Sequence, residues 1–171
     1  MLIFLADKVL LIGNSHTLSS YTNKRWEGEL FRIANAQIDS EFFNTKSNKN
    51  NFKNDFTFCF PASMHGHRKG LFYTIFSWIK FFKEIKLLKK DLPNLILTGK
   101  LPKSYDEFLK KQYGDSFKKN FNIDIRGWVS AKDLKAIYLK SKYLIAVPLE
   151  EGQVAAVLEA IAFGISPIIS K

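Results

Sequence analysis

Short apolar runs that alternate with longer amphipathic stretches limit the fold of this chain more than any other feature. Runs rich in β-branched and aromatic residues are typical of buried strands, and apolar residues at every third or fourth position are typical of helices. Strands are predicted at residues 9–13, 57–60, 95–98, 123–126, 143–147 and 167–169, and helices at 71–90, 105–119, 134–140 and 154–163. This alternation predicts an α/β fold in which helices cover both faces of a parallel sheet.

Three helix boundaries carry signals of their own. Pro93 follows the helix predicted at 71–90 and helps to end it. Ser130 precedes Asp133 by three residues, which is typical of an N-cap with an acidic first turn, and Gly164 closes the last predicted helix.

The composition fits a folded chain with anionic partners. A length of 171 residues gives room for one domain, or for one domain and part of another. A hydrophobic content of 46% excludes global disorder, and a net charge of +10 favours phosphates, nucleotides, nucleic acid or anionic lipid as partners. The single cysteine, Cys59, permits neither an internal disulfide nor a Cys-based zinc site, which favours a reducing, cytoplasmic compartment.

The apolar segments are too short to be membrane spans. Residues 1–5 are apolar but are interrupted too soon for a cleavable signal, and residues 70–79 end well short of the roughly 20 residues that a spanning helix needs. We therefore expect a cytoplasmic protein, with peripheral contact at the inner face of the membrane left open. Residues 44–55 are rich in Asn and Lys and are predicted to form a surface loop. The chain stops directly after its last predicted strand, so we expect covering elements to be missing there.

The segment after the strand at 143–147 carries the most chemistry. Glu151 and Gly152 lie in a turn at the carboxyl end of that strand, where ligands bind in open α/β sheets. The backbone N–H groups of Gly152, Gln153 and Val154 would be unpaired at a helix start, which is typical of a phosphate or hydroxyl site. Glu159 follows eight residues after Glu151, about 12 Å along a helix axis.

Two interpretations of this pair remain open on spacing alone. In one, the two carboxylates contact opposite ends of an elongated polar ligand, and Glu159 meets a partner that offsets its place on an apolar helix. In the other, Glu151 only favours the helix N-terminus and Glu159 is a solvated helix residue.

The residues around the pair resemble a known family. The order Glu151-Gly152, helix, Leu158-Glu159-Ala160, Gly164 resembles the Glu-x7-Glu motif of the retaining, GT-B-fold glycosyltransferases of group 1, or family 4. Four upstream segments resemble the same family: Gly127-Trp128-Val129 followed by Leu134 and Tyr138, Pro93 to Gly99, Arg68-Lys69-Gly70, and Asn35 to Asp39. The resemblance implies an incomplete C-terminal half of a GT-B fold, with a Rossmann-like sheet.

The resemblance also implies roles for single residues. Glu151, the catalytic candidate, would contact the donor sugar, and Glu159 would hold the ribose of the nucleotide. The diphosphate would meet the helix start at Gly152, Gln153 and Val154. The remaining candidates are Lys69 for the diphosphate, with Arg68 beside it, and the loop of Gly127, Trp128 and Val129 for the base.

By the same resemblance, residues 1–38 are the tail of an N-terminal acceptor domain with its interdomain link, and residues 39–171 are the nucleotide-sugar-binding domain. The implied function is transfer of a sugar from a nucleoside diphosphate sugar to a glycan or lipid-linked acceptor. No metal is expected, since His65 and His67 lack a third ligand at useful spacing. No cofactor and no nucleic-acid partner are expected either. The isolated chain is expected to be inactive, because most of the acceptor domain is missing.

Several features depart from this family or favour other functions. Ser63 stands where many members have an arginine, so either the phosphate clamp is weaker or Arg68 or His67 substitutes for that arginine. Leu149 stands where a serine is usual. The lysines at 80–90 and 110–119 would suit a stand-alone basic module that binds nucleic acid or anionic membrane. A sugar-nucleotide epimerase or a phosphorylase of the same fold is a further alternative.

Overall fold

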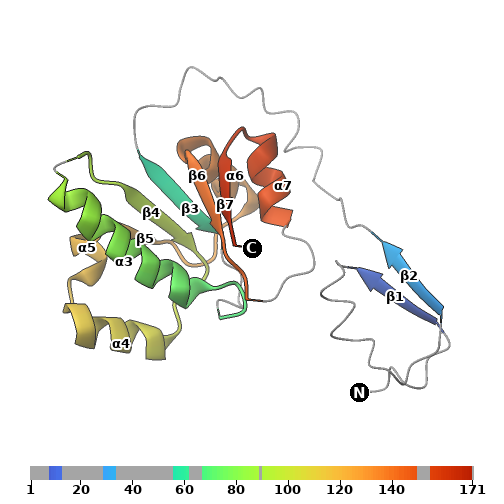
Figure 1. Cartoon of the computed structure of the whole chain (residues 1–171), viewed down its shortest axis with the longest axis horizontal. Helices are drawn as coiled ribbons and strands as arrows, with labels where there is room; N and C mark the ends of the chain where they lie inside the picture. The colour runs from blue at the N-terminus through green and yellow to red at the C-terminus, as the bar shows by residue number, and fades with distance from the viewer. Residues whose placement is uncertain are drawn as a thin grey trace.

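A five-stranded parallel sheet forms the centre of the computed structural model, which describes residues 8–12, 29–33, 56–61, 67–88, 90–149 and 155–170 (Figure 1). Its strands are β3 (Thr57–Pro61), β4 (Asn94–Thr98), β5 (Ile123–Ile125), β6 (Tyr143–Ala146) and β7 (Ser166–Ile169). They lie in the order β5-β4-β3-β6-β7, and every neighbouring pair is parallel. The five strands correspond to those predicted from the apolar runs, which confirms the α/β fold with its Rossmann-like sheet.

Five helices of the described residues cover the two faces of this sheet. They are α3 (Leu71–Leu87), α4 (Lys103–Tyr113), α5 (Phe117–Asn120), α6 (Ala131–Lys140) and α7 (Ala155–Ala162). One buried cluster joins α3, α4 and α5 to one face, and a second joins α6 and α7 to the other face. Side chains alternate between the clusters along a strand: Phe58 and Phe60 belong to the first and Cys59 to the second. This period of two is what a strand that is buried on both faces requires.

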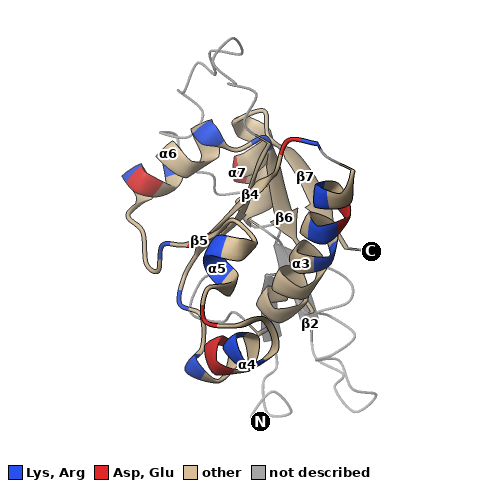
Figure 2. Ribbon diagram, turned by 90° about the vertical axis from the view of Figure 1, so that its left-hand side faces the viewer, with Lys and Arg blue, Asp and Glu red and all other residues tan. Residues whose placement is uncertain are grey.

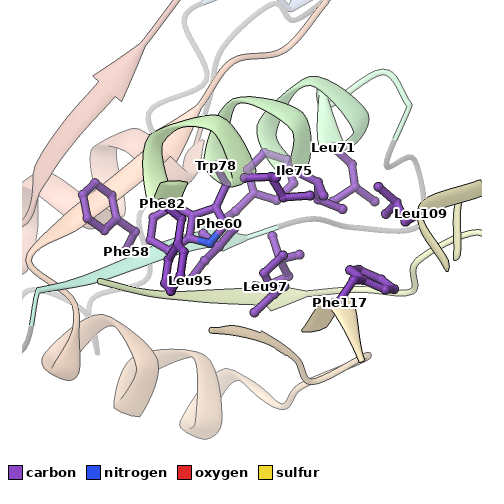
Figure 3. Close-up of a cluster of buried hydrophobic side chains, with 12 residues drawn as sticks. Phe58, Phe60, Leu71, Ile75, Trp78, Phe82, Leu95, Leu97, Leu109 and Phe117 are labelled. Carbon is purple, nitrogen blue, oxygen red and sulfur yellow. The ribbon is translucent and has the colours of Figure 1, made fainter. Parts of the chain in front are cut away.

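Aromatic and aliphatic side chains together fill the larger cluster (Figure 3). Trp78 on α3 packs edge-on against Phe58 of β3, with ring centroids 5.2 Å apart. The indole N–H of Trp78 donates a hydrogen bond of 2.8 Å to the carbonyl oxygen of Phe121, which lies just before β5. Burial of large rings is the main favourable contribution to a core of this size, and the paired indole removes the penalty for burying a polar atom.

The helix predicted at 105–119 is wrong in one respect, because the structure has two helices there. Gly114 has φ 83° and ψ 164°, far from helical values, so α4 ends and α5 starts after it. Asp106 on α4 links the two helices through ion pairs with Lys110 at 2.6 Å and Lys118 at 2.7 Å. Hydrogen bonds from these two lysines, Lys110 first, lower the pKa of Asp106.

Other helix ends agree with the sequence signals. The backbone N–H of Asp133 donates to the hydroxyl of Ser130 at 3.1 Å, which confirms the predicted N-cap of α6. The helix α7 ends just before Gly164. Figure 2 shows basic residues on the later turns of α3 and acidic and basic residues as neighbours on α4. Among the described helices, none combines the length and the apolar character needed to cross a bilayer.

A separate pair of strands precedes the sheet in the chain. The strand β1 (Lys8–Ile12) was predicted, and it pairs in parallel with β2 (Glu29–Ile33), which was not predicted. The link at 35–39 and the loop at 44–55 lie outside the described residues. The division into domains at residue 38 stays a prediction.

A close backbone contact fixes the turn before α3 against the end of β6. The backbone N–H of Leu149 donates to the carbonyl oxygen of Arg68 at 2.9 Å. Gly70, two residues on, has φ 79°, and a Cβ atom there would collide with the carbonyl oxygen of Val147. Only glycine fits this position, since both the conformation and the contact exclude a side chain.

Gly70→Ala should therefore lower the free energy of unfolding by about 3 kcal/mol or more, combining left-handed strain with overpacking. Gly164→Ala is the matched control, because Gly164 has φ 71° but nothing within 4 Å of an added Cβ. The control should lose only about 1 kcal/mol. Urea unfolding of both variants measures the difference, and equal losses would contradict the close contact.

Candidate functional site

A cavity of about 220 Å³ lies at the carboxyl edge of the sheet. Its walls come from three strand ends and two helices: Pro61, Thr98 and Gly99 follow or end β3 and β4, Trp128 and Val129 follow β5, Leu134 and Tyr138 belong to α6, and Ala156 and Glu159 belong to α7. Residues from 61 to 159 thus meet at one place. The cavity lies at the edge where the sequence predicted a ligand site, because ligands of open α/β sheets bind at the carboxyl ends of the strands.

The order of the strands explains why a cavity forms there. The strand β3 has β4 on one side and β6 on the other. The chain leaves β3 through α3 on one face and leaves β6 through α7 on the opposite face. Connections that diverge from neighbouring strands leave a crevice at their carboxyl ends, and α6 and α7 form its outer wall here.

The loop after β5 is tied to β4 by backbone hydrogen bonds. The N–H of Gly99 donates to the carbonyl oxygen of Gly127 at 2.6 Å, and the N–H of Arg126 donates to that of Leu97 at 2.9 Å. This attachment brings Trp128 and Val129 to the cavity. Trp128 is 66% exposed, which is unusual for so large an apolar ring. An exposed ring at a cavity edge offers a flat surface on which a base can stack.

Glu159 reaches the cavity from α7 and has a buried partner. The hydroxyl of Tyr138 donates a hydrogen bond of 2.8 Å to Oε2 of Glu159. Tyr138 itself is fully buried, whereas Glu159 is half-buried. Burial, and then the negative charge of Glu159, raise the pKa of Tyr138 far above its usual range, so the phenol stays protonated and acts as a donor. The carboxylate predicted to need a partner has one.

The basic candidates lie outside the cavity wall. Lys69 is half-buried and Arg68 is exposed in the turn before α3, and neither lines the cavity. The bond between Arg68 and Leu149 places this turn beside the chain that leaves β6. The same chain continues to the candidate residues Glu151, Gly152, Gln153 and Val154, which lie outside the described residues together with Glu150 and Ser63.

One of the two histidines, His67, contacts a tyrosine in the first turn of α4. His65 lies outside the described residues, and Nδ1 of His67 is 2.9 Å from the hydroxyl of Tyr105. Within the described ranges, no group of three or more His, Cys, Asp or Glu side chains could hold a metal ion. The bond to Tyr105 instead ties the turn before α3 to the first turn of α4.

The single cysteine, Cys59, is buried in the sheet. Cys59 on β3 is 1% exposed, and burial raises the pKa of its thiol to about 11. The thiolate is therefore scarce at neutral pH, which agrees with the structural role predicted for it.

No family model and no curated protein matches this chain. Among solved structures, TarM of S. aureus superposes with a TM-score of 0.67 at 12% identity. WaaG, a glycosyltransferase involved in lipopolysaccharide biosynthesis, gives 0.63 at 15% identity, and Alr3699/HepE of Anabaena gives 0.63 at 10%.

These superpositions cover 98%, 94% and 97% of this chain but 30%, 43% and 45% of the three structures. The chain therefore spans less than half the length of each. At such low identity the likeness shows the fold, which is that of part of a GT-B glycosyltransferase. The fold implied by the sequence motifs is thus confirmed.

The bond between Tyr138 and Glu159 generates a prediction about stability. Glu159→Leu removes the acceptor of a buried hydroxyl and should lower the free energy of unfolding by about 1–3 kcal/mol. Glu159→Gln keeps a carbonyl oxygen in reach and should lose less. Denaturant unfolding of both variants, repeated in a Tyr138→Phe background, isolates the bond. The difference in the free energy of unfolding between Glu159→Leu and Glu159→Gln should be smaller in the Tyr138→Phe background. An unchanged difference would contradict the hydrogen bond.

Proposed function

We propose that this chain is the donor-binding part of a retaining glycosyltransferase, which transfers a sugar from a nucleoside diphosphate sugar to a glycan or lipid-linked acceptor. One observation carries the proposal. Glu159, the second glutamate of the motif, lies in the wall of the cavity at the carboxyl edge of a GT-B-type sheet, with its carboxylate held by a buried donor. The alternative interpretation, in which Glu159 is only a solvated helix residue, explains neither its place in the cavity wall nor its bond to Tyr138.

The cavity suits the nucleoside end of the donor. Its volume of about 220 Å³ is below the range of about 300–1,000 Å³ for pockets that enclose a whole ligand. The base would stack on Trp128 beside Val129 and Gly127, and the ribose hydroxyls would donate to Glu159. The diphosphate and sugar would then extend out of the cavity towards the turn that contains Glu151.

The diphosphate would meet positive charge and backbone donors. Lys69 and Arg68 lie beside the chain that leaves β6 and leads to this turn. The N–H groups of Gly152, Gln153 and Val154 precede α7, which starts at Ala155, and helix N-termini attract phosphate. Negative charge grows on the leaving diphosphate when its bond to the anomeric carbon breaks, so these groups would favour the transition state.

Glu151 would contact the sugar hydroxyls and orient the anomeric carbon towards the acceptor. In a retaining reaction, the acceptor oxygen bonds to the face of the sugar from which the diphosphate leaves. The structure of Alr3699/HepE is described as a complex with UDP and glucose, and that of a TarM mutant as a complex with UDP. UDP is therefore the first ligand to test with this chain. A stand-alone basic module is not favoured, since it accounts for neither the cavity nor the motif.

Glu159→Gln should weaken UDP binding by about 1.5–3 kcal/mol, because hydrogen bonds from the ribose to a charged acceptor are lost. Isothermal titration calorimetry on the 171-residue chain measures the affinity. Glu84→Gln on the exposed side of α3 is the matched control and should bind as the wild type does. Equal affinity of the Glu159 variant and the control would remove Glu159 from the site.

A further inference from the structure

The tyrosine that contacts Glu159 is buried more deeply than the glutamate itself. Tyr138 has no exposed surface, and its ring packs on Phe163 at the end of α7, with centroids 5.5 Å apart. Its carbonyl oxygen accepts a hydrogen bond of 3.1 Å from the N–H of Ser141. The phenol ring thus packs against the end of α7, and Tyr138 is one of the residues that line the cavity.

A glutamate at a cavity edge needs such a fixed partner to serve as a ligand-binding group. Immobilising the flexible side chain of glutamate costs conformational entropy, which ligand binding must otherwise offset. The bond from Tyr138 occupies one lone pair of Oε2, and an ionised carboxylate has about four such acceptor positions. Glu159 therefore keeps acceptor capacity for hydroxyl groups in the cavity while its orientation is set in advance.

We propose that Tyr138 is a positioning residue that sets the ribose selectivity of this site. Its hydroxyl holds the Glu159 carboxylate in the orientation in which it accepts hydrogen bonds from a vicinal diol. This inference rests on the proposed function of Glu159 as the ribose contact. A site arranged to pair with hydroxyl groups discriminates against ligands that lack them, because its polar groups are then left unpaired.

The competing explanation is that the bond serves only the fold. A buried tyrosine hydroxyl needs an acceptor, and Glu159 could be no more than that. The two explanations differ in one measurable respect. A purely structural bond affects the binding of every nucleotide alike, whereas a positioning bond affects only nucleotides that carry ribose hydroxyls.

Tyr138→Phe removes the hydroxyl and keeps the ring, so the packing on Phe163 remains. The experiment measures by calorimetry the affinity of the 171-residue chain for UDP and for 2′,3′-dideoxy-UDP. Tyr138→Phe should weaken UDP binding about tenfold and dideoxy-UDP binding less than twofold. Tyr143→Phe makes the same chemical change at the start of β6, away from the cavity, and should alter neither affinity.

A Glu159→Gln background separates this inference from the proposed function. If Glu159→Gln weakens UDP binding and Tyr138→Phe adds less than twofold to it, the two residues act as one unit, as we propose. Suppose that Glu159→Gln weakens UDP binding but that Tyr138→Phe alone either has no effect or weakens UDP and dideoxy-UDP binding equally. Tyr138 then has no positioning role, and the proposed function stands. If the wild type binds UDP, GDP and ADP no better than the Glu159→Gln variant does, the proposed function fails, and the inference fails with it.

Discussion

The hydrogen-bonding of β3 to two parallel neighbours is the constraint on which the rest of the structure depends. Phe58 of β3 pairs with Leu95 of β4 on one side and with Tyr143 of β6 on the other. Because both pairings are parallel, every connection must cross a face of the sheet, and the chain diverges at the carboxyl end of this strand. The cavity, the turn before α3 and the chain that leads to Glu151 all lie at that divergence. Gly70 matters for the same reason, since only a residue without a side chain lets the turn reach Val147.

The pairing of the Glu159 carboxylate is the second constraint at this edge of the sheet. A carboxylate on an otherwise apolar helix is unfavourable unless it is paired, and Tyr138 supplies the pairing without neutralising the charge. Glu159 therefore remains an acceptor in the wall of the cavity that the exposed indole ring of Trp128 also lines. The proposed function uses this acceptor for the ribose and the ring of Trp128 as a stacking surface for the base.

Much of this could be predicted from the sequence, because periodicity reports burial directly. Alternate residues of the central strands face different clusters, as at Phe58 and Cys59, so their runs are apolar throughout and were recognised. The strand β2 was missed because its sequence, Glu-Leu-Phe-Arg-Ile, carries two charged residues. The break at Gly114 was missed because a single glycine does not reveal its φ angle. The contact between Tyr138 and Glu159 joins residues 21 positions apart on two helices, and no local pattern encodes such a pairing.

A crystal structure of the chain with UDP would test the central claim most directly. We expect both ribose hydroxyls within about 3.2 Å of the Glu159 carboxylate oxygens, the uracil against Trp128, and the hydroxyl of Tyr138 still bonded to Oε2. The diphosphate should extend towards Lys69 and the turn at Glu151. UDP bound elsewhere, or bound in the cavity with its ribose turned away from Glu159, would contradict the account.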